Sequence, residues 1–169
     1  MRLRLIIGLG NSGVEYTHTY HNVGFLAVHY FRGLARAHTF SLPEDRLLLT
    51  DGSMNTSGAF VRTALARFKV PPAELLLVHD DSDIALGHYK FSFSRGSAGH
   101  KGVEDVVRAL GTNVFWRLRI GIRKEGDHTK ALDLVLQPIP EDAKKILTGV
   151  FEEAAIRLTE GASQPRTKA

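Results

Sequence analysis

Histidine, aspartate and asparagine residues recur where a predicted strand ends or where a tight turn precedes a helix. A neutral imidazole that is held by a carboxylate is a general base, able to activate water near pH 7. Amide side chains can contact a carbonyl group under attack. The sequence has no cysteine and no obvious nucleophilic serine motif, so these residues predict direct attack by water. The candidates in such positions are Asn11, His21, Asn55, Asp80 and His100.

A glycine-rich turn lies ahead of His21. Gly8, Gly10 and Gly13 follow an apolar run and match the G-x-G-x-x-G pattern of dinucleotide-binding turns. That fold requires an acidic residue about 20 residues further on for the ribose, whereas no aspartate or glutamate occurs between Tyr16 and Leu42. The sequence therefore favours a structural turn over a nucleotide cofactor.

A cluster of acidic residues follows a second apolar run. Residues 79–83, HDDSD, contain carboxylates and an imidazole that could bind a divalent cation. The same composition is typical of a solvated turn, or of one acid that orients a histidine elsewhere, and further ligands at a recognised spacing are lacking. We therefore expect neither a metal ion nor another cofactor.

Positive charge is concentrated in one part of the chain. The net charge is +4 with a pI near 9.5, but residues 88–130 hold nine basic side chains against four acidic ones. Such a band could bind a polyanion. The alternative is a solvated basic face without a partner.

The elements that must position these residues alternate between strand and helix. This alternation predicts an α/β fold, a single domain with a twisted mixed β-sheet flanked by helices. In such a sheet, polar residues at strand ends converge on one edge. We expect strands over 3–9, 47–49, 75–78, 87–93 and 117–122, a short strand or turn over 133–136, and helices over 25–37, 59–68 (capped by Ser57), 103–110 and 141–158. In the last helix, the side chains that should face the core are those of Ala143, Ile146, Leu147, Val150 and Ala154.

Length and composition set the remaining expectations. A chain of 169 residues fits one domain, which we place at residues 1–160, followed by a flexible tail over 161–169. No apolar run approaches the roughly 20 residues that span a bilayer, and the first residues are not typical of a signal peptide. We expect a cytoplasmic protein that acts as a monomer and does not bind membranes.

Six segments, in this order, resemble the bacterial-type peptidyl-tRNA hydrolases: LIIGLGNSG, EYTHTYHNVGF, SMNTSG, LLVHDDSDIALG, GSAGHKGVEDV and WRLRIGI. The similarity spans residues 3–158. It implies a carboxylic-ester hydrolase that cleaves the ester between a peptide and the 3′-terminal adenosine of tRNA, recycling the tRNA without a metal.

The resemblance also implies roles for individual residues. His21 would be the general base and Asp80 the acid that orients it, while Asn11 would contact the peptide and Asn55 would position the ester and its water. Substrate-binding positions implied by the resemblance are Tyr16, Ser53, Met54, Asn55, His100 and Lys101, with Lys90 and Arg119 at tRNA phosphates.

Lys101 departs from the family pattern, because GHKG stands where GHNG is usual. A lysine can donate a hydrogen bond to a developing oxyanion or to a phosphate, but it cannot accept one as asparagine does. Two hypotheses therefore remain: an active peptidyl-tRNA hydrolase, and a catalytically weakened tRNA- or RNA-binding relative of the same fold.

Overall fold

One mixed sheet forms the centre of the protein. The computed structural model describes residues 1–163, and in this part the strands form a five-stranded sheet in the order β2-β1-β3-β5-β4. β4 is antiparallel to β5, and the other neighbouring strands are parallel. The strands are β1 (Leu5–Gly8), β2 (Leu47–Leu49), β3 (Leu75–Ala85), β4 (Tyr89–Phe93) and β5 (Trp116–Arg123). The predicted single-domain α/β fold with a mixed sheet is confirmed.

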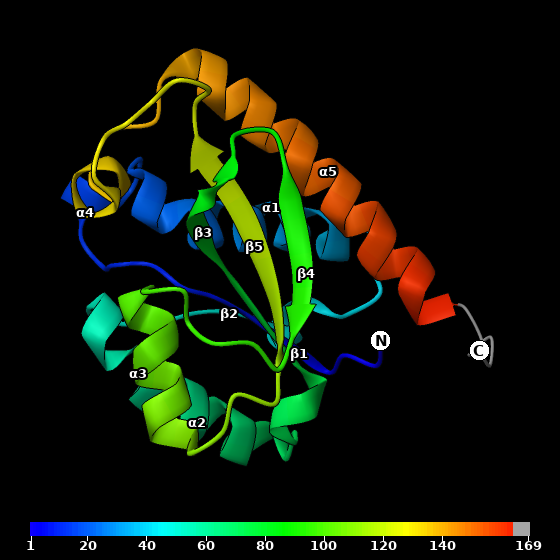
Figure 1. The fold of residues 1–169 in the computed structure, drawn as a ribbon. Helices are drawn as coiled ribbons and strands as arrows, with labels where there is room; N and C mark the ends of the chain where they lie inside the picture. Colours follow the sequence, from blue (N-terminus) through cyan, green and yellow to red (C-terminus); the bar gives the residue numbers. More distant parts are fainter. Residues whose placement is uncertain (164–169) are drawn as a thin grey trace, which may run out of the picture.

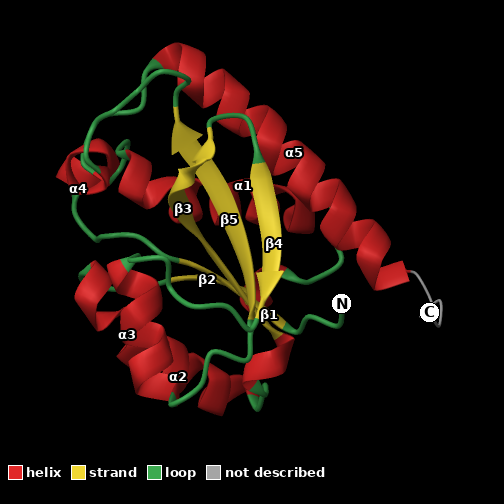
Figure 2. Ribbon diagram, in the orientation of Figure 1, coloured by secondary structure: helices red, strands yellow, loops and turns green. Residues whose placement is uncertain are grey.

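Helices cover both faces of the sheet (Figures 1 and 2). On one face α1 (Val23–Arg36) and α5 (Glu141–Ser163) pack on side chains such as Ile6, Val78 and Leu118. On the other face α2 (Ser57–Phe68) and α3 (Lys101–Leu110) pack on side chains such as Ile7 and Leu77. Because both faces are covered, β1 and the first half of β3 are apolar without alternation.

Glycines bring the start of α1 into contact with the ends of two strands. A Cβ atom on Gly24 would lie 2.4 Å from the carbonyl oxygen of Val78, and one on Gly8 would lie 2.5 Å from the carbonyl oxygen of Gly24. Neither position accepts a side chain unless the backbone moves. The glycine-rich segment therefore permits close packing, which places His21, just before α1, beside the end of β3.

Three predictions about individual elements are wrong. β3 continues to Ala85, so the acidic residues 79–83 belong to a strand and not to a turn. Residues 133–136 do not form a strand, because α4 (Ala131–Val135) occupies that segment. Ser57 is the first residue of α2 and is buried, and the Ser53 backbone N–H instead donates to Thr56 Oγ1 (3.2 Å) to close the turn that leads into α2.

The C-terminal helix also differs from the prediction. Ile146 is 43% exposed, whereas Ala143, Leu147, Val150 and Ala154 are buried as expected. α5 runs to Ser163, past the expected start of the tail at residue 161, and the rest of that predicted tail lies outside the described residues. Among the residues that the structure describes, no helix combines the length and hydrophobicity needed to cross a bilayer.

Candidate active site

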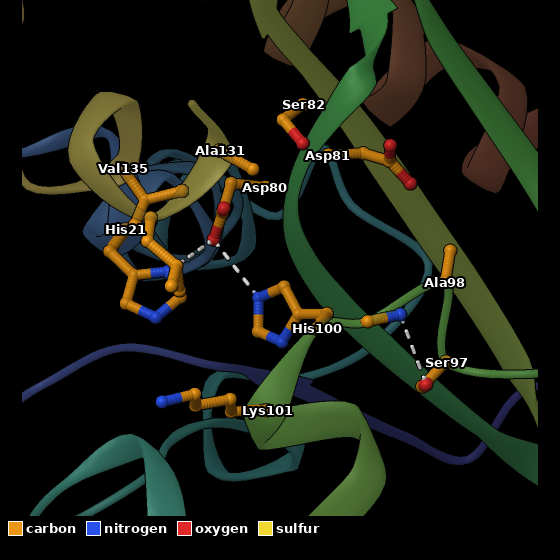
Figure 3. Close-up of a pocket in the computed structure, with 12 residues that line it drawn as sticks. His21, Asp80, Asp81, Ser82, Ser97, Ala98, His100, Lys101, Ala131 and Val135 are labelled. Atoms are coloured by element: carbon orange, nitrogen blue, oxygen red, sulfur yellow. Dashed lines mark hydrogen bonds and ion pairs between the residues drawn. The ribbon is translucent and has the colours of Figure 1, made fainter. Parts of the chain in front are cut away.

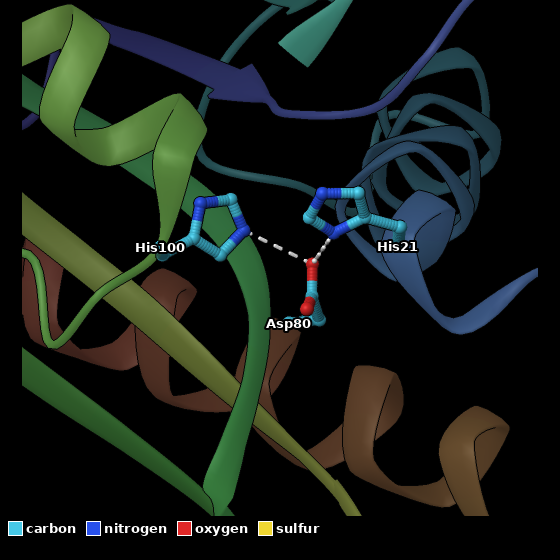
Figure 4. A group of neighbouring side chains, drawn as sticks. All are labelled: His21, Asp80 and His100. Carbon is cyan, nitrogen blue, oxygen red and sulfur yellow. Dashed lines mark hydrogen bonds and ion pairs between the residues drawn. The ribbon is translucent and has the colours of Figure 1, made fainter. Parts of the chain in front are cut away.

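The second half of β3 extends beyond its neighbour β1. β1 pairs with Leu75–Val78 and ends at Gly8, opposite Val78, while β5 accompanies β3 further on the other side. The edge of β3 on the β1 side is thus left open from His79 onward. His21 and His100 approach Asp80 at this edge, the first from the segment before α1 and the second from the loop before α3 (Figure 4).

Both histidines bind the same carboxylate oxygen. The distance from Asp80 Oδ1 to His21 Nδ1 is 2.9 Å, and that to His100 Nε2 is 3.1 Å. The side chains are largely buried, with exposed fractions of 2% for Asp80, 8% for His100 and 13% for His21. The predicted pairing of His21 with Asp80 is therefore present in the structure, and His100 joins it.

Hydrogen bonds determine which ring nitrogens carry protons. The backbone N–H of Val103 donates to His100 Nδ1 (3.3 Å), so His100 carries its proton on Nε2 and donates it to Asp80. His21 Nδ1 likewise donates to the carboxylate. The remaining nitrogen of His21, Nε2, points away from Asp80 in both close-up views (Figures 3 and 4). His21 therefore presents a free lone pair, as a general base requires.

Asp80 is ionised at neutral pH despite its burial. Burial alone would raise the pKa of Asp80, but the electrostatic interactions and hydrogen bonds with His100 and His21 lower the pKa far below its usual range. A fixed negative charge beside His21 would stabilise the imidazolium if the ring took up a proton.

The same three side chains are the group in the described chain whose ligand atoms are close enough to share a metal ion, all lying within 4.8 Å of one another. His100 Nε2 could bind a metal only by giving up its proton. Its Nδ1 would then have to carry the proton and would point it at the N–H of Val103, which also donates. The hydrogen bonds therefore fit a proton-transfer site and do not fit a metal centre. The carboxylates of the acidic segment 79–83, which could have bound a cation together, are separated, since Asp81 binds Arg119.

A second cluster fixes Asn11 beside this network. Asn22, next to His21 in the chain, accepts from the backbone N–H of Asn11 (2.8 Å) and donates to its carbonyl (3.0 Å). Asn11 Oδ1 accepts from the backbone N–H of Met54 (2.7 Å). The NH₂ group of the Asn11 side chain is the polar group left to contact a substrate. Asn55 follows Met54 in the same short helical turn, and its side chain is exposed.

A cavity of about 80 Å³ opens at His21 and Asp80 (Figure 3). Lys101 is exposed at its rim, and the helix α4 forms part of its wall. The lining residues are His21, Asp80, Asp81, Ser82, Ser97, Ala98, Gly99, His100, Lys101, Ala131, Leu132 and Val135. Among the described residues, those that line the cavity do not include Tyr16, Ser53, Asn55, Lys90 or Arg119.

The basic band is less available than the sequence suggests. Arg117 is 1% exposed, Arg119 donates to Asp81 (2.7 Å), and Arg123 donates to the carbonyl of Ser82 (2.7 Å). These arginines alternate with apolar residues on β5, so their side chains lie on one sheet face, and there they meet partners that the sequence alone does not show. Lys90, opposite Arg119 in the β4–β5 pairing, is exposed.

Sequence reasoning missed several residues that build the site. Asn22 is one of them, although an amide next to a candidate base is a usable signal. α4 has five residues, too few to show a helical period. Asp81 and His79 were assigned to a turn because polar residues usually end a buried strand.

The fold and the carboxylate-held imidazole define the class of the chain as a hydrolase that uses water. A family model described as peptidyl-tRNA hydrolase matches residues 5–169, and the chain belongs to this family. The structure resembles that of a variant of the peptidyl-tRNA hydrolase from Acinetobacter baumannii, with a TM-score of 0.81 and 31% identity over 96% of this chain and 89% of that one. A second structure of the peptidyl-tRNA hydrolase from that organism gives a TM-score of 0.76 and 30% identity, covering 95% and 90% of the two chains.

Related sequences agree with this assignment. A peptidyl-tRNA hydrolase of Aromatoleum aromaticum is 42% identical over 168 residues, covering 91% of this chain and 83% of the relative. One of Thiobacillus denitrificans is 40% identical over 162 residues, covering 89% and 80%. These likenesses do not favour the alternative of a weakened RNA-binding relative, and the contact between His21 and Asp80 is complete in spite of Lys101.

Proposed function

We propose that this chain hydrolyses the ester between the peptide and the 3′-terminal adenosine of peptidyl-tRNA, with His21 as the general base. The observation that carries the proposal is the state of His21. Its Nδ1 is held by an ionised carboxylate, and its Nε2 is free beside an open cavity. No metal or other cofactor takes part in the proposed reaction.

The proposed reaction has two proton transfers at one nitrogen. His21 Nε2 takes a proton from water while the water oxygen attacks the ester carbonyl carbon, giving a tetrahedral intermediate. When the intermediate collapses, the bond to the ribose 3′-oxygen breaks and His21 returns the proton to that oxygen. Asp80 stabilises the imidazolium between the two transfers.

The amide side chains and Lys101 would handle the substrate. The Asn11 side-chain NH₂ group donates to the peptide, while Asn55 and the exposed Lys101 supply donors to the oxyanion. Tyr16, Ser53 and Met54 are proposed to line the path of the terminal adenosine and the ester. We assign His100 a positioning role, since both of its ring nitrogens are already bonded within the protein.

Phosphate binding is proposed for exposed cations outside the cavity, with Lys90 and the partly exposed Arg119 as the main contacts. Arg119 is also paired with Asp81, so Lys90 would contribute more of the salt-dependent affinity. We propose that the chain acts on its substrate as a monomer in the cytoplasm.

The test measures release of the acyl group from N-acetyl-aminoacyl-tRNA by the purified protein in excess chelator. We expect turnover on this substrate, little on aminoacyl-tRNA with a free amino group, and near-complete loss in His21→Ala. Binding of tRNA without turnover would contradict the proposed function. Activity that disappears in chelator and returns with a divalent cation would contradict the mechanism.

A further inference from the structure

We infer that His79 and Arg117, two buried residues to which the mechanism gives no role, are positioning residues that hold His100 against Asp80. The inference rests on the proposed function, because it concerns the same catalytic carboxylate. His79 acts on the ring of His100, and Arg117 acts on the loop that carries it.

His79 supports the imidazole of His100 directly. The two ring centroids lie 4.6 Å apart with the planes at 66°, an edge-to-face arrangement. His79 is fully buried, and its Nδ1 donates to the backbone carbonyl of Asp80 (2.7 Å). Burial lowers the pKa of His79 well below its usual range, so the ring is neutral. One uncharged side chain therefore contacts both the backbone of Asp80 and the ring of His100.

Arg117 supports the loop that leads to His100. Its Nη2 donates to the carbonyl oxygen of Gly96 (2.7 Å), and the side chain is almost completely buried beneath the loop. The loop needs such support because Ser94 and Ala98, which are not glycines, have φ angles of 51° and 53°. The loop then passes through Gly99 into His100, the residue that caps α3.

Stability does not explain the presence of these two residues. Arg117 Nη1 and His79 Nε2 are buried and lack a hydrogen-bond partner among the described residues, and such groups lower the stability of a fold. Burial and the nearby Arg119 also lower the pKa of Arg117, so its charge is held at a cost. Well-packed apolar side chains would avoid these penalties. Both residues contact the elements that present His100, which accounts for their position.

The experiment is a set of double-mutant cycles on N-acetyl-aminoacyl-tRNA hydrolysis. His79→Phe keeps an aromatic ring, Arg117→Met keeps a long unbranched side chain, and both changes remove the polar groups. We expect each to lower kcat/KM by about tenfold, since a small misplacement near the reacting groups has effects of this size or larger. In a His100→Ala background each should lower it by less than about twofold, because the residue through which they act is gone. Arg32→Met is the matched control, since Arg32 also donates to a backbone carbonyl, that of Leu47 (2.8 Å), away from the site.

A second measurement does not depend on catalysis. Two-bond ¹H–¹⁵N spectra report the tautomer of His100, and we expect the Nε2–H form in the wild-type protein and a mixture of forms in His79→Phe and Arg117→Met. If the two variants show changed spectra but the wild-type protein does not hydrolyse the ester, the proposed function is contradicted and the inference stands. Wild-type spectra and activity in both variants, or equal losses with and without His100, would overturn the inference. If either variant fails to fold, His79→Gln and Arg117→Gln take its place.

Discussion

The two sides of Asp80 hold the same kind of residue in different surroundings. His21 and His100 donate to the same carboxylate oxygen at nearly the same distance. On the His21 side the second ring nitrogen is free and adjoins a cavity. On the His100 side the second nitrogen accepts from Val103, and the ring packs against His79. The two histidines therefore differ at their second ring nitrogen. His21 can exchange a proton there, whereas His100 is held in place.

Removal of the free imidazole should have the largest effect. His21→Ala takes away the proposed base, and we expect kcat/KM for N-acetyl-aminoacyl-tRNA to fall by about 10³-fold, within the range typical of general-base catalysis. Binding of tRNA should be unchanged, because His21 is mostly buried and is not one of the proposed phosphate contacts. Full turnover in His21→Ala would contradict the proposal that His21, and not His100, exchanges protons with the substrate and water.

Asp80→Asn should affect the contacts with His21 and with His100 at the same time. An amide has the same shape as the carboxylate, but it can place its own N–H groups against His21 and it cannot stabilise the imidazolium. We expect a loss of about 10²- to 10³-fold in kcat with little change in KM. The measurement is steady-state kinetics from pH 6 to pH 9. A KM effect with unchanged kcat would assign Asp80 to substrate binding.

His100→Ala should have a smaller effect than either of these changes. It removes one of two donors to Asp80 and leaves His21 in contact with it, so we expect a loss of about tenfold in kcat/KM, the effect of one hydrogen bond to a charged group. His100→Gln can keep a donor near Asp80 and should recover part of the loss. A decrease as large as that of His21→Ala would mean that the two histidines have the same role.

The pH dependence of stability should reveal the neutral His79. Burial lowers its pKa in the folded protein, so below about pH 6.5 the unfolded chain binds a proton at His79 that the folded protein does not bind. Above that pH the residue leaves the free energy of unfolding unchanged. Below it, the free energy of unfolding falls by up to about 1.4 kcal/mol per pH unit. Denaturant unfolding at pH 7.5 and pH 5.5 should therefore show a smaller difference for His79→Phe, by about 1 kcal/mol. Equal differences would contradict a neutral, buried ring.

Lys90→Ala should weaken tRNA binding without changing the site around Asp80. Loss of one phosphate contact should weaken tRNA binding a few-fold and reduce the slope of log K against log salt by about 1. Cleavage of a short 3′-acyl-nucleotide should not change. Lys145→Ala, which removes an exposed lysine from α5, is the matched control. Equal damage to both substrates would contradict the separation of phosphate binding from catalysis.

The sequence predicted the core of the fold and the first contact of the site. Leu75–Val78 is apolar on both faces because helices cover both, and such a run is visible in the sequence. The pairing of His21 with Asp80 was implied by the resemblance to the peptidyl-tRNA hydrolases, because the two residues lie far apart in the sequence. The extension of β3 was not predicted, since Asp81 is stabilised by Arg119 from another strand and His79 by a carbonyl of its own strand. The contact between Asp81 and Arg119 joins distant segments, and contacts of this kind override local composition.

The role of His100 could not be predicted from its type. Its tautomer depends on the N–H of Val103, which reaches it because α3 begins immediately after His100. The sequence indicated only a glycine-rich turn before a helix. Likewise, nothing in the pattern of β5 distinguishes the buried Arg117 from the paired Arg119, since both alternate with apolar neighbours.

Because β3 is pleated, the adjacent residues Asp80 and Asp81 have different binding partners. Asp80 and Asp81 point to opposite faces, so one binds the histidines and the other binds Arg119 (Figure 3). One additional residue between Leu75 and His79 would exchange the two faces, even though every side chain of the site was still present in the sequence. Two additional residues would restore the faces. The chemistry proposed for this protein thus depends on whether the number of residues before Asp80 in its strand is odd or even.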